Sequence, residues 1–213
     1  MTQTADSQPK RQRLAFEDRR RAFIEKAIEY FAEEGFESST RELARRLGVT
    51  QPLLYRYFPS KEDLIAEVYT TVYVNRWREE WATLLRDRSM PLRDRLETFY
   101  RAYTDVVFQR DWMRIFLFSG LKGVDINRRY LELVRERILI PIVEEVNFDA
   151  GRDHIAASEQ QIETAWVVHG GIFYSGVRSV IYDAAPIENK DFVIRTSLET
   201  LFAQLGKQDG EAD

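Results

Sequence analysis

Helical spacing of apolar residues runs through nearly the whole chain, and it restricts the fold more than any other feature. In the first such segment Phe23, Ala27 and Phe31 recur every fourth residue, which places them on one face of a helix. No segment alternates apolar and polar residues as a half-buried strand does. The pattern predicts an all-α protein.

The predicted helices fill the chain after a polar, non-periodic start. Gly35 followed by apolar Phe36 is typical of a helix end, so the first helix is expected at about 17–34. Pro141 predicts a kink in a later helix. The other eight of about nine helices are expected at about 40–47, 51–58, 61–77, 91–110, 111–119, 125–146, 158–182 and 187–205.

Composition excludes several classes of site. The chain has no cysteine, which rules out disulfides and thiolate metal centres, and its two histidines are few for other metal sites. A Gly-rich phosphate loop and a Ser-His-Asp spacing are both missing from the sequence. We therefore expect no enzyme, no catalytic residue, no metal and no cofactor. Without a long apolar run or a signal-peptide core, a cytoplasmic protein that makes no membrane contact is expected.

The net charge of −4 conceals an uneven distribution. Up to Lys61 there are 12 basic and 9 acidic residues, whereas the rest of the chain has 19 and 26. The average argues against a general polyanion binder, but the N-terminal excess leaves room for a local one. Opposite signs in the two parts indicate two different tasks.

Two short helices joined by a tight turn are predicted in the basic part. Ser39 and Glu42 have the spacing of a capping box, and Gly48 ends the short helix that follows. Thr50 is expected to cap the second short helix, with Pro52 in its first turn. Two such helices packed under a longer one form a helix-turn-helix.

The second short helix has an unusual exposed face. At about 100° per residue, Leu54 and Phe58 point together toward the core. The remaining side chains suit a major groove, because Gln pairs with adenine, Arg reaches guanine or phosphate, and apolar groups pack on thymine methyls. Tyr57 fits either the groove or the core. This face consists of Gln51, Pro52, Leu53, Tyr55, Arg56 and Tyr57.

The stretch from Thr40 to Lys61, TRELARRLGVTQPLLYRYFPSK, resembles the DNA-binding domain of the tetracycline-repressor (TetR) family. The likeness extends over residues 21–68 and keeps the family's Thr, Leu-Ala, Leu-Gly-Val, Leu-Tyr, Phe and Lys in place. Arg56 and Tyr57 depart from the family pattern, so the resemblance does not imply a particular operator sequence.

The resemblance implies a homodimeric repressor on a near-palindromic double-stranded DNA operator, released by a small-molecule effector bound in the helical body. Helix N-termini with hydroxyl or cationic side chains favour phosphate contact, which adds residues to the groove face. The DNA-binding residues expected are Thr40, Arg41, Thr50, Gln51, Pro52, Leu53, Tyr55, Arg56, Tyr57 and Lys61.

Aromatic residues concentrate in the second part of the chain, which holds all four tryptophans. Aromatic residues at helical spacing lie more often in a core than in a ligand pocket. His169 is likewise interpreted first as a core histidine bonded to a neighbour. The density still favours a hydrophobic or aromatic ligand. The predicted pocket comprises Tyr69, Tyr73, Arg76, Trp77, Phe99, Tyr103, Trp112, Phe116, Trp166 and His169.

The last two helices are predicted to form the dimer interface. The helix over 158–182 is apolar on nearly every side, so it needs a partner besides its own body. Gly170, Gly171 and Gly176 each cost about 1 kcal/mol in a helix, which the close approach of a partner helix or ligand would offset. The predicted interface residues are Phe173, Val177, Val180, Ile181, Leu198, Leu201, Phe202 and Leu205.

The domain prediction follows from these parts. We expect a flexible arm at 1–12, a helix-turn-helix domain at 13–60, a ligand-binding and dimerisation domain at 61–206 and a flexible tail at 207–213. Two alternatives stay open. One is a helical small-molecule-binding protein or enzyme whose head is non-functional, and the other is a regulator that answers to a protein partner instead of an inducer.

Overall fold

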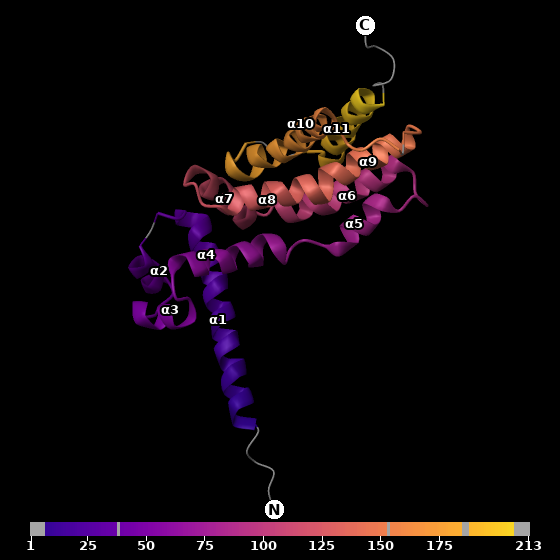
Figure 1. Ribbon diagram of the computed structural model, residues 1–213. Coiled ribbons are helices and arrows are strands. Elements are labelled where there is room, and N and C mark those ends of the chain that lie inside the picture. Colours follow the sequence, from indigo (N-terminus) through magenta and orange to yellow (C-terminus); the bar gives the residue numbers. More distant parts are fainter. Residues whose placement is uncertain (1–6, 38, 153, 185–187, 207–213) are drawn as a thin grey trace, which may run out of the picture.

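A computed structural model of the chain describes residues 7–37, 39–152, 154–184 and 188–206. Every regular element in these ranges is helical, as predicted (Figure 1). Three of the helices contain or continue into a π-helical turn, at η1 (Thr70–Val74), η2 (Arg135–Leu139) and η3 (Val177–Ile181). The α-helices are α1 (Ser7–Glu34), α2 (Thr40–Arg46), α3 (Gln51–Tyr57), α4 (Lys61–Tyr69), α5 (Glu79–Arg86), α6 (Leu92–Val107), α7 (Arg110–Leu121), α8 (Ile126–Val134), α9 (Ile140–Asp149), α10 (Glu159–Gly176) and α11 (Lys190–Leu205).

The first helix is longer than its apolar period indicates. α1 begins at Ser7 and not near Glu17, so residues 7–12 of the expected arm are helical. This segment contains Lys, Arg and Gln, which favour helices even without an apolar stripe, and Pro9 lies in the first turn, where proline is tolerated. Residues 1–6 of the predicted arm, the tail at 207–213 and the predicted helix start at Ile187 lie outside the described residues.

The helix predicted over 61–77 is interrupted, and α5 was not predicted. α4 passes into η1 and the chain then leaves the helix before Glu79. No proline or glycine marks this break. It therefore depends on tertiary packing, in which Trp77, within the break, lies in edge-to-face contact with Trp81 on α5.

The predicted irregularity at Pro141 appears one turn earlier in the chain. Pro141 has no N–H to donate to the preceding turn, and its ring crowds the carbonyl four residues before it. The helix accommodates this through the wider turn η2, between α8 and α9.

Side-chain caps fix the short helices around the turn. The Ser39 hydroxyl accepts from the Glu42 backbone N–H, and the Thr50 hydroxyl accepts from Leu53 N–H. The predicted capping box at Ser39 is only half formed, because the Glu42 carboxylate accepts from Arg45. A full capping box is found at Ser60, with Asp63 as its partner.

The helix-turn-helix unit is attached to the body along two helices. α4 leads from α3 toward the body, and the end of α1 packs on α7 (Figure 1). Beyond them α6, α8, α9, α10 and α11 form the layered bundle. Gly35 has a φ of 73° where α1 turns toward α2, a conformation that disfavours any side chain.

Candidate functional site

The exposed face of α3 has the orientation that the helical angles predict. Leu54 and Phe58 are buried in the core, while Pro52, Tyr55 and Arg56 are exposed. Leu53 is half-buried. Tyr55 is 39% exposed, which is high for a large aromatic residue in a small domain.

Thr40, Gln51 and Tyr55 form one hydrogen-bonded cluster between α2 and α3. The Gln51 amide Nε2 donates to the Thr40 hydroxyl over 2.8 Å. The same hydroxyl lies 3.0 Å from the Tyr55 hydroxyl. Thr40 therefore holds two predicted base-reading side chains in place, while Gln51 retains its carbonyl oxygen and a second N–H for a base edge.

Tyr57 is turned toward α1. Its ring stacks on Phe16 with centroids 4.4 Å apart and meets Phe23 edge-to-face at 5.1 Å. Between the two alternatives left open for Tyr57, this packing favours the structural one. The N-terminal extension of α1 thus supports the recognition helix through Phe16, a contact that apolar periodicity did not reveal.

The arginines of this domain fall into two groups. Arg45 pairs with Glu42, and Arg46 pairs with Glu33 and Glu34 on α1. Among the described residues, Arg41 and Arg56 are exposed and have no ion pair. Arg41 and Arg56 are therefore available to phosphate or bases, whereas the charges of Arg45 and Arg46 are largely neutralised.

Two predicted DNA-binding residues have structural contacts in the free protein. The Lys61 ammonium donates to the Phe36 carbonyl over 2.5 Å, which joins the start of α4 to the end of α1. The Thr50 hydroxyl caps α3. Both also sit at helix N-termini, so phosphate contact is compatible with these roles.

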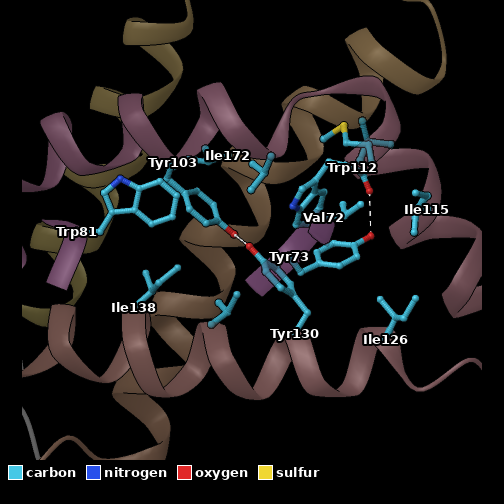
Figure 2. Packing of buried hydrophobic residues seen from close by; sticks show 14 of the residues in the cluster. Val72, Tyr73, Trp81, Tyr103, Trp112, Ile115, Ile126, Tyr130, Ile138 and Ile172 are labelled. Atoms are coloured by element: carbon cyan, nitrogen blue, oxygen red, sulfur yellow. Dashed lines mark hydrogen bonds between the residues drawn. The ribbon is translucent and has the colours of Figure 1, made fainter. Parts of the chain in front are cut away.

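Most of the predicted pocket residues pack together in the aromatic core of the body, in which Figure 2 labels Tyr73, Tyr103 and Trp112. Tyr73, Trp112 and Phe116 are in mutual ring contact, and the Tyr73 hydroxyl donates to the Trp112 carbonyl at 3.1 Å. Trp81 bridges to Phe99 and Tyr103. Tyr130, Phe173 and Tyr100 also belong to this core, although the sequence did not place them in the pocket.

A hydrogen-bonded chain crosses this core. The His169 ring nitrogens lie 3.4 Å from the hydroxyls of Tyr100 and Tyr103, and Tyr103 is 2.7 Å from the Tyr130 hydroxyl. Burial lowers the pKa of His169 to about 4 and raises the pKa of each tyrosine. At neutral pH all four groups are uncharged, which agrees with a core histidine bonded to its neighbours.

Tyr69 and Arg76 lie at the edges of the core. Tyr69 lines an apolar groove of about 330 Å³ between α4 and the start of α8, together with Ile65 and Ile126. Arg76 forms an ion pair with Asp111 at 2.5 Å beside a separate depression. This groove touches both α4 and the body.

Arg114 connects the aromatic core helix to the DNA-binding domain. α7 carries Trp112 and Phe116 in the core, while Arg114 donates to the carbonyls of Ala32 and Glu33 at the end of α1. A cation at a helix C-terminus is favourable because it meets unpaired carbonyls and the negative end of the dipole. One helix therefore contacts both candidate sites.

Four of the eight predicted dimer residues point into their own protomer. Val177, Leu198, Leu201 and Leu205 are buried in their own chain, and Phe173 packs on Trp112 and Phe116. The apolar stripe that the sequence shows is thus the inner face. Val180, Ile181 and Phe202 are half-buried.

A different face of the last helices is exposed. Val167 and Tyr174 on α10 are 74% and 54% exposed, and Gly170 and Gly171 lie between them. Their spacing of three and four residues could have identified this face. Phe192 on α11 is also exposed.

Two absences apply to the described part of the chain. No group of His, Asp and Glu residues there could hold a metal ion. None of its helices is long and apolar enough to cross a membrane.

Comparison with known proteins shows a family match for the helix-turn-helix and a likeness in fold for the body. Residues 23–68 match the family model of bacterial regulatory proteins, tetR family. A TetR-like transcriptional regulator from Rhodococcus sp. RHA1 superposes with a TM-score of 0.65 at 16% identity, covering 89% of this chain and 97% of that one. A TetR family transcriptional regulator from Pseudomonas syringae pv. tomato gives 0.61 at 20% identity, covering 87% and 95%.

A third similar structure holds a ligand. It is the Thermus thermophilus FadR, a TetR family transcriptional repressor in complex with lauroyl-CoA, with a TM-score of 0.54, 19% identity and coverage of 91% and 97%. The matched model covers the helix-turn-helix, and the structures extend the likeness in fold over the body. Residues 23–68 therefore match the DNA-binding domain of the tetR family of bacterial regulatory proteins, and the described body shares the fold of TetR-family regulators.

Proposed function

We propose that this protein is a homodimeric, sequence-specific DNA-binding repressor that leaves its operator when a small, largely apolar molecule binds the body. The observation that carries the proposal is the Thr40–Gln51–Tyr55 cluster, flanked by the unpaired Arg41 and Arg56. It offers base-reading groups and free cations on one surface, which is what a major groove requires.

The division of labour follows from the chemistry of each side chain. Gln51 presents an acceptor and a donor in the arrangement that pairs with adenine. Arg41 opens α2, where its charge adds to the backbone N–H groups that attract phosphate. Arg56 reaches either phosphate or guanine. Pro52 and Leu53 supply apolar surface for a thymine methyl.

The exposed face of α10 supports dimerisation. A Cβ atom added at Gly170 or Gly171 would meet nothing within 4 Å in the chain, so their own protomer does not require glycine there. Each still costs helix stability. Close crossing of a second α10 would explain both glycines and would cover Val167 and Tyr174. Two heads related by such an axis would read half-sites about 34–36 Å apart on a near-palindrome.

Two contacts would transmit ligand binding to the heads. The groove at Tyr69 lies against α4, so an occupant would press directly on the helix that follows α3. Arg114 on α7 donates a hydrogen bond to the Ala32 carbonyl at the end of α1. The FadR neighbour binds lauroyl-CoA, so this fold can admit a long apolar ligand. By linkage, a ligand that weakens DNA binding must bind the DNA complex less tightly, typically by about 1–3 kcal/mol.

The proposal is tested by selecting duplexes from a random DNA library with the full-length protein and measuring affinity by fluorescence anisotropy. A repressor of this kind enriches a two-fold-symmetric site and binds it as a dimer. Lack of any enriched sequence would favour the alternative in which the head is non-functional. An enriched site without release by any apolar compound would favour a regulator that answers to a protein partner.

A further inference from the structure

Several buried side-chain donors among the described residues of the body have no hydrogen-bond acceptor. In the described part of the chain, three buried side-chain atoms have no hydrogen-bond partner, namely Nε1 of Trp77, Nε1 of Trp81 and Nε of Arg95. All three are N–H donors. Buried polar groups are normally paired, so three unpaired donors without any unpaired side-chain acceptor beside them in the same described ranges call for an explanation.

Two of these donors lie together in the aromatic core. The indoles of Trp77 and Trp81 are in edge-to-face contact with centroids 5.1 Å apart. Trp81 is also in contact with Tyr103, which belongs to the hydrogen-bonded chain (Figure 2). The two unpaired N–H groups and this chain are therefore continuous.

The hydrogen-bonded chain of tyrosines and His169 contributes a further donor without an acceptor. Tyr100, His169, Tyr103 and Tyr130 are linked by three contacts. Three phenols and a neutral imidazole carry four protons for three contacts, so whichever way the contacts point, one phenol keeps an unused O–H. This unused donor lies at Tyr100, Tyr103 or Tyr130.

The charged side chains near this region are already paired. Arg137, beside the Trp77 ring, pairs with Glu79, and Arg129, at the Tyr69 groove, pairs with Asp125. The buried carboxylate of Glu145 already accepts from Arg88 and Arg95. Arg76 is paired with Asp111, and Arg114 is bonded to carbonyls of α1. A charged group brought into the core would lose its hydration without gaining a counter-ion.

Resting on the proposed function, we propose that the effector is an uncharged, aromatic or apolar molecule whose carbonyl-type oxygen accepts hydrogen bonds from Trp81 and its neighbouring donors. Such an oxygen supplies what the core lacks and introduces no charge. The groove at Tyr69 gives it a way in, since the Tyr69 ring stacks on Tyr73, which in turn contacts Tyr130.

Four compounds of similar shape test this chemistry on the full-length protein by calorimetry. They are benzophenone (neutral acceptor), diphenylmethane (no acceptor), diphenylacetate (anion) and benzhydrylamine (cation). Benzophenone is expected to bind about tenfold more tightly than diphenylmethane, the value of one hydrogen bond of about 1.4 kcal/mol. The two ions are expected to bind more weakly still. Equal binding of benzophenone and diphenylmethane, preference for an ion, or no binding at all would overturn the inference.

Indole N–H signals of tryptophan-labelled protein give a second readout that needs no variant. Benzophenone should shift the Trp77 and Trp81 signals downfield, and diphenylmethane should not. In Trp81→Phe the advantage of benzophenone over diphenylmethane should disappear, whereas in the control Tyr182→Phe, at an exposed aromatic residue, it should persist. Unmoved Trp77 and Trp81 signals in the presence of bound benzophenone would contradict the assignment of these donors.

Operator binding separates this inference from the proposed function. If benzophenone binds as expected but the selected operator stays bound, the proposed release of operator by ligand is wrong and the inferred ligand chemistry is supported. If diphenylacetate or benzhydrylamine releases the operator and benzophenone does not bind, the repressor model stands and the inferred chemistry is wrong.

Discussion

The Gln51 amide donates to the Thr40 hydroxyl across 2.8 Å, so the first residue of the recognition helix is fixed to the first residue of the helix before it. Tyr55 meets the same hydroxyl one turn later on α3. Neither contact follows from periodicity, since the residues are 11 and 15 positions apart in the chain. A side chain held in this way loses less entropy on binding a base.

Gln51→Ala is expected to weaken binding to the selected operator by about 1–3 kcal/mol and to leave binding to random DNA almost unchanged, because it removes a base contact. Arg41→Ala should weaken both and lower the salt slope by about 1, because it removes a phosphate contact. Anisotropy titrations on both DNAs, at several salt concentrations, measure this. The same pattern in both variants would refute the division of roles.

Thr40→Val should reduce operator affinity through its neighbours. The substitution keeps the shape of the side chain but removes the hydroxyl that Gln51 and Tyr55 share. If Thr40 acts by positioning Gln51, the double variant Thr40→Val/Gln51→Ala should lose less than the sum of the single losses. Simple additivity would mean that Thr40 acts independently of Gln51.

Alanine substitutions at two glycines of α10 should affect dimerisation and folding separately. Gly171→Ala has open space in the protomer, so it should favour the helix by about 1 kcal/mol yet weaken the dimer. Gly176→Ala is the matched control, since its Cβ would overlap the ring of Phe108 and should destabilise the fold by about 1–3 kcal/mol. Light scattering and urea unfolding report the two properties. An unaltered dimer in both Gly171→Ala and Gly170→Ala would remove this face from the interface.

Arg114→Met should separate ligand binding from release. The variant keeps an unbranched stem on α7 but loses the hydrogen bonds to Ala32 and Glu33 carbonyls at the end of α1. We expect unchanged ligand affinity in the free protein and a coupling with operator that falls by about 1 kcal/mol or more. Ligand titrations with and without operator measure the coupling. An unchanged coupling would leave α4 as the only proposed route.

His169 predicts a loss of stability in acid. Burial lowers its pKa from 6.5 to about 4, so between these values the unfolded chain binds more protons than the folded one. The neutral His169 contributes fully to the free energy of unfolding above about pH 6.5. This contribution is lost as the pH falls toward 4, and the loss near pH 4 is about 3 kcal/mol. Urea unfolding near pH 7 and near pH 4 should show a smaller difference in His169→Gln. Identical pH dependence in both proteins would contradict the predicted shift.

The sequence by itself determined the helical class, the turn at Gly48 and the outward face of α3. These features depend on local rules, namely apolar period, caps such as Thr50 and Ser60, and positive φ at glycine, so neighbouring residues suffice to predict them. The motif from Thr40 to Lys61 was recognisable for the same reason, because its spacing is fixed within a short stretch.

Tertiary structure decided which face of each body helix is inside. In α10 and α11 apolar residues occur on more than one side, and only packing places Leu198 and Leu201 in the core and Val167 outside. The break between α4 and α5 and the meeting of Trp77 with Trp81 likewise depend on contacts between elements. Whether a buried donor finds an acceptor is a property of the assembled core, so the unpaired indoles had no signal in the sequence.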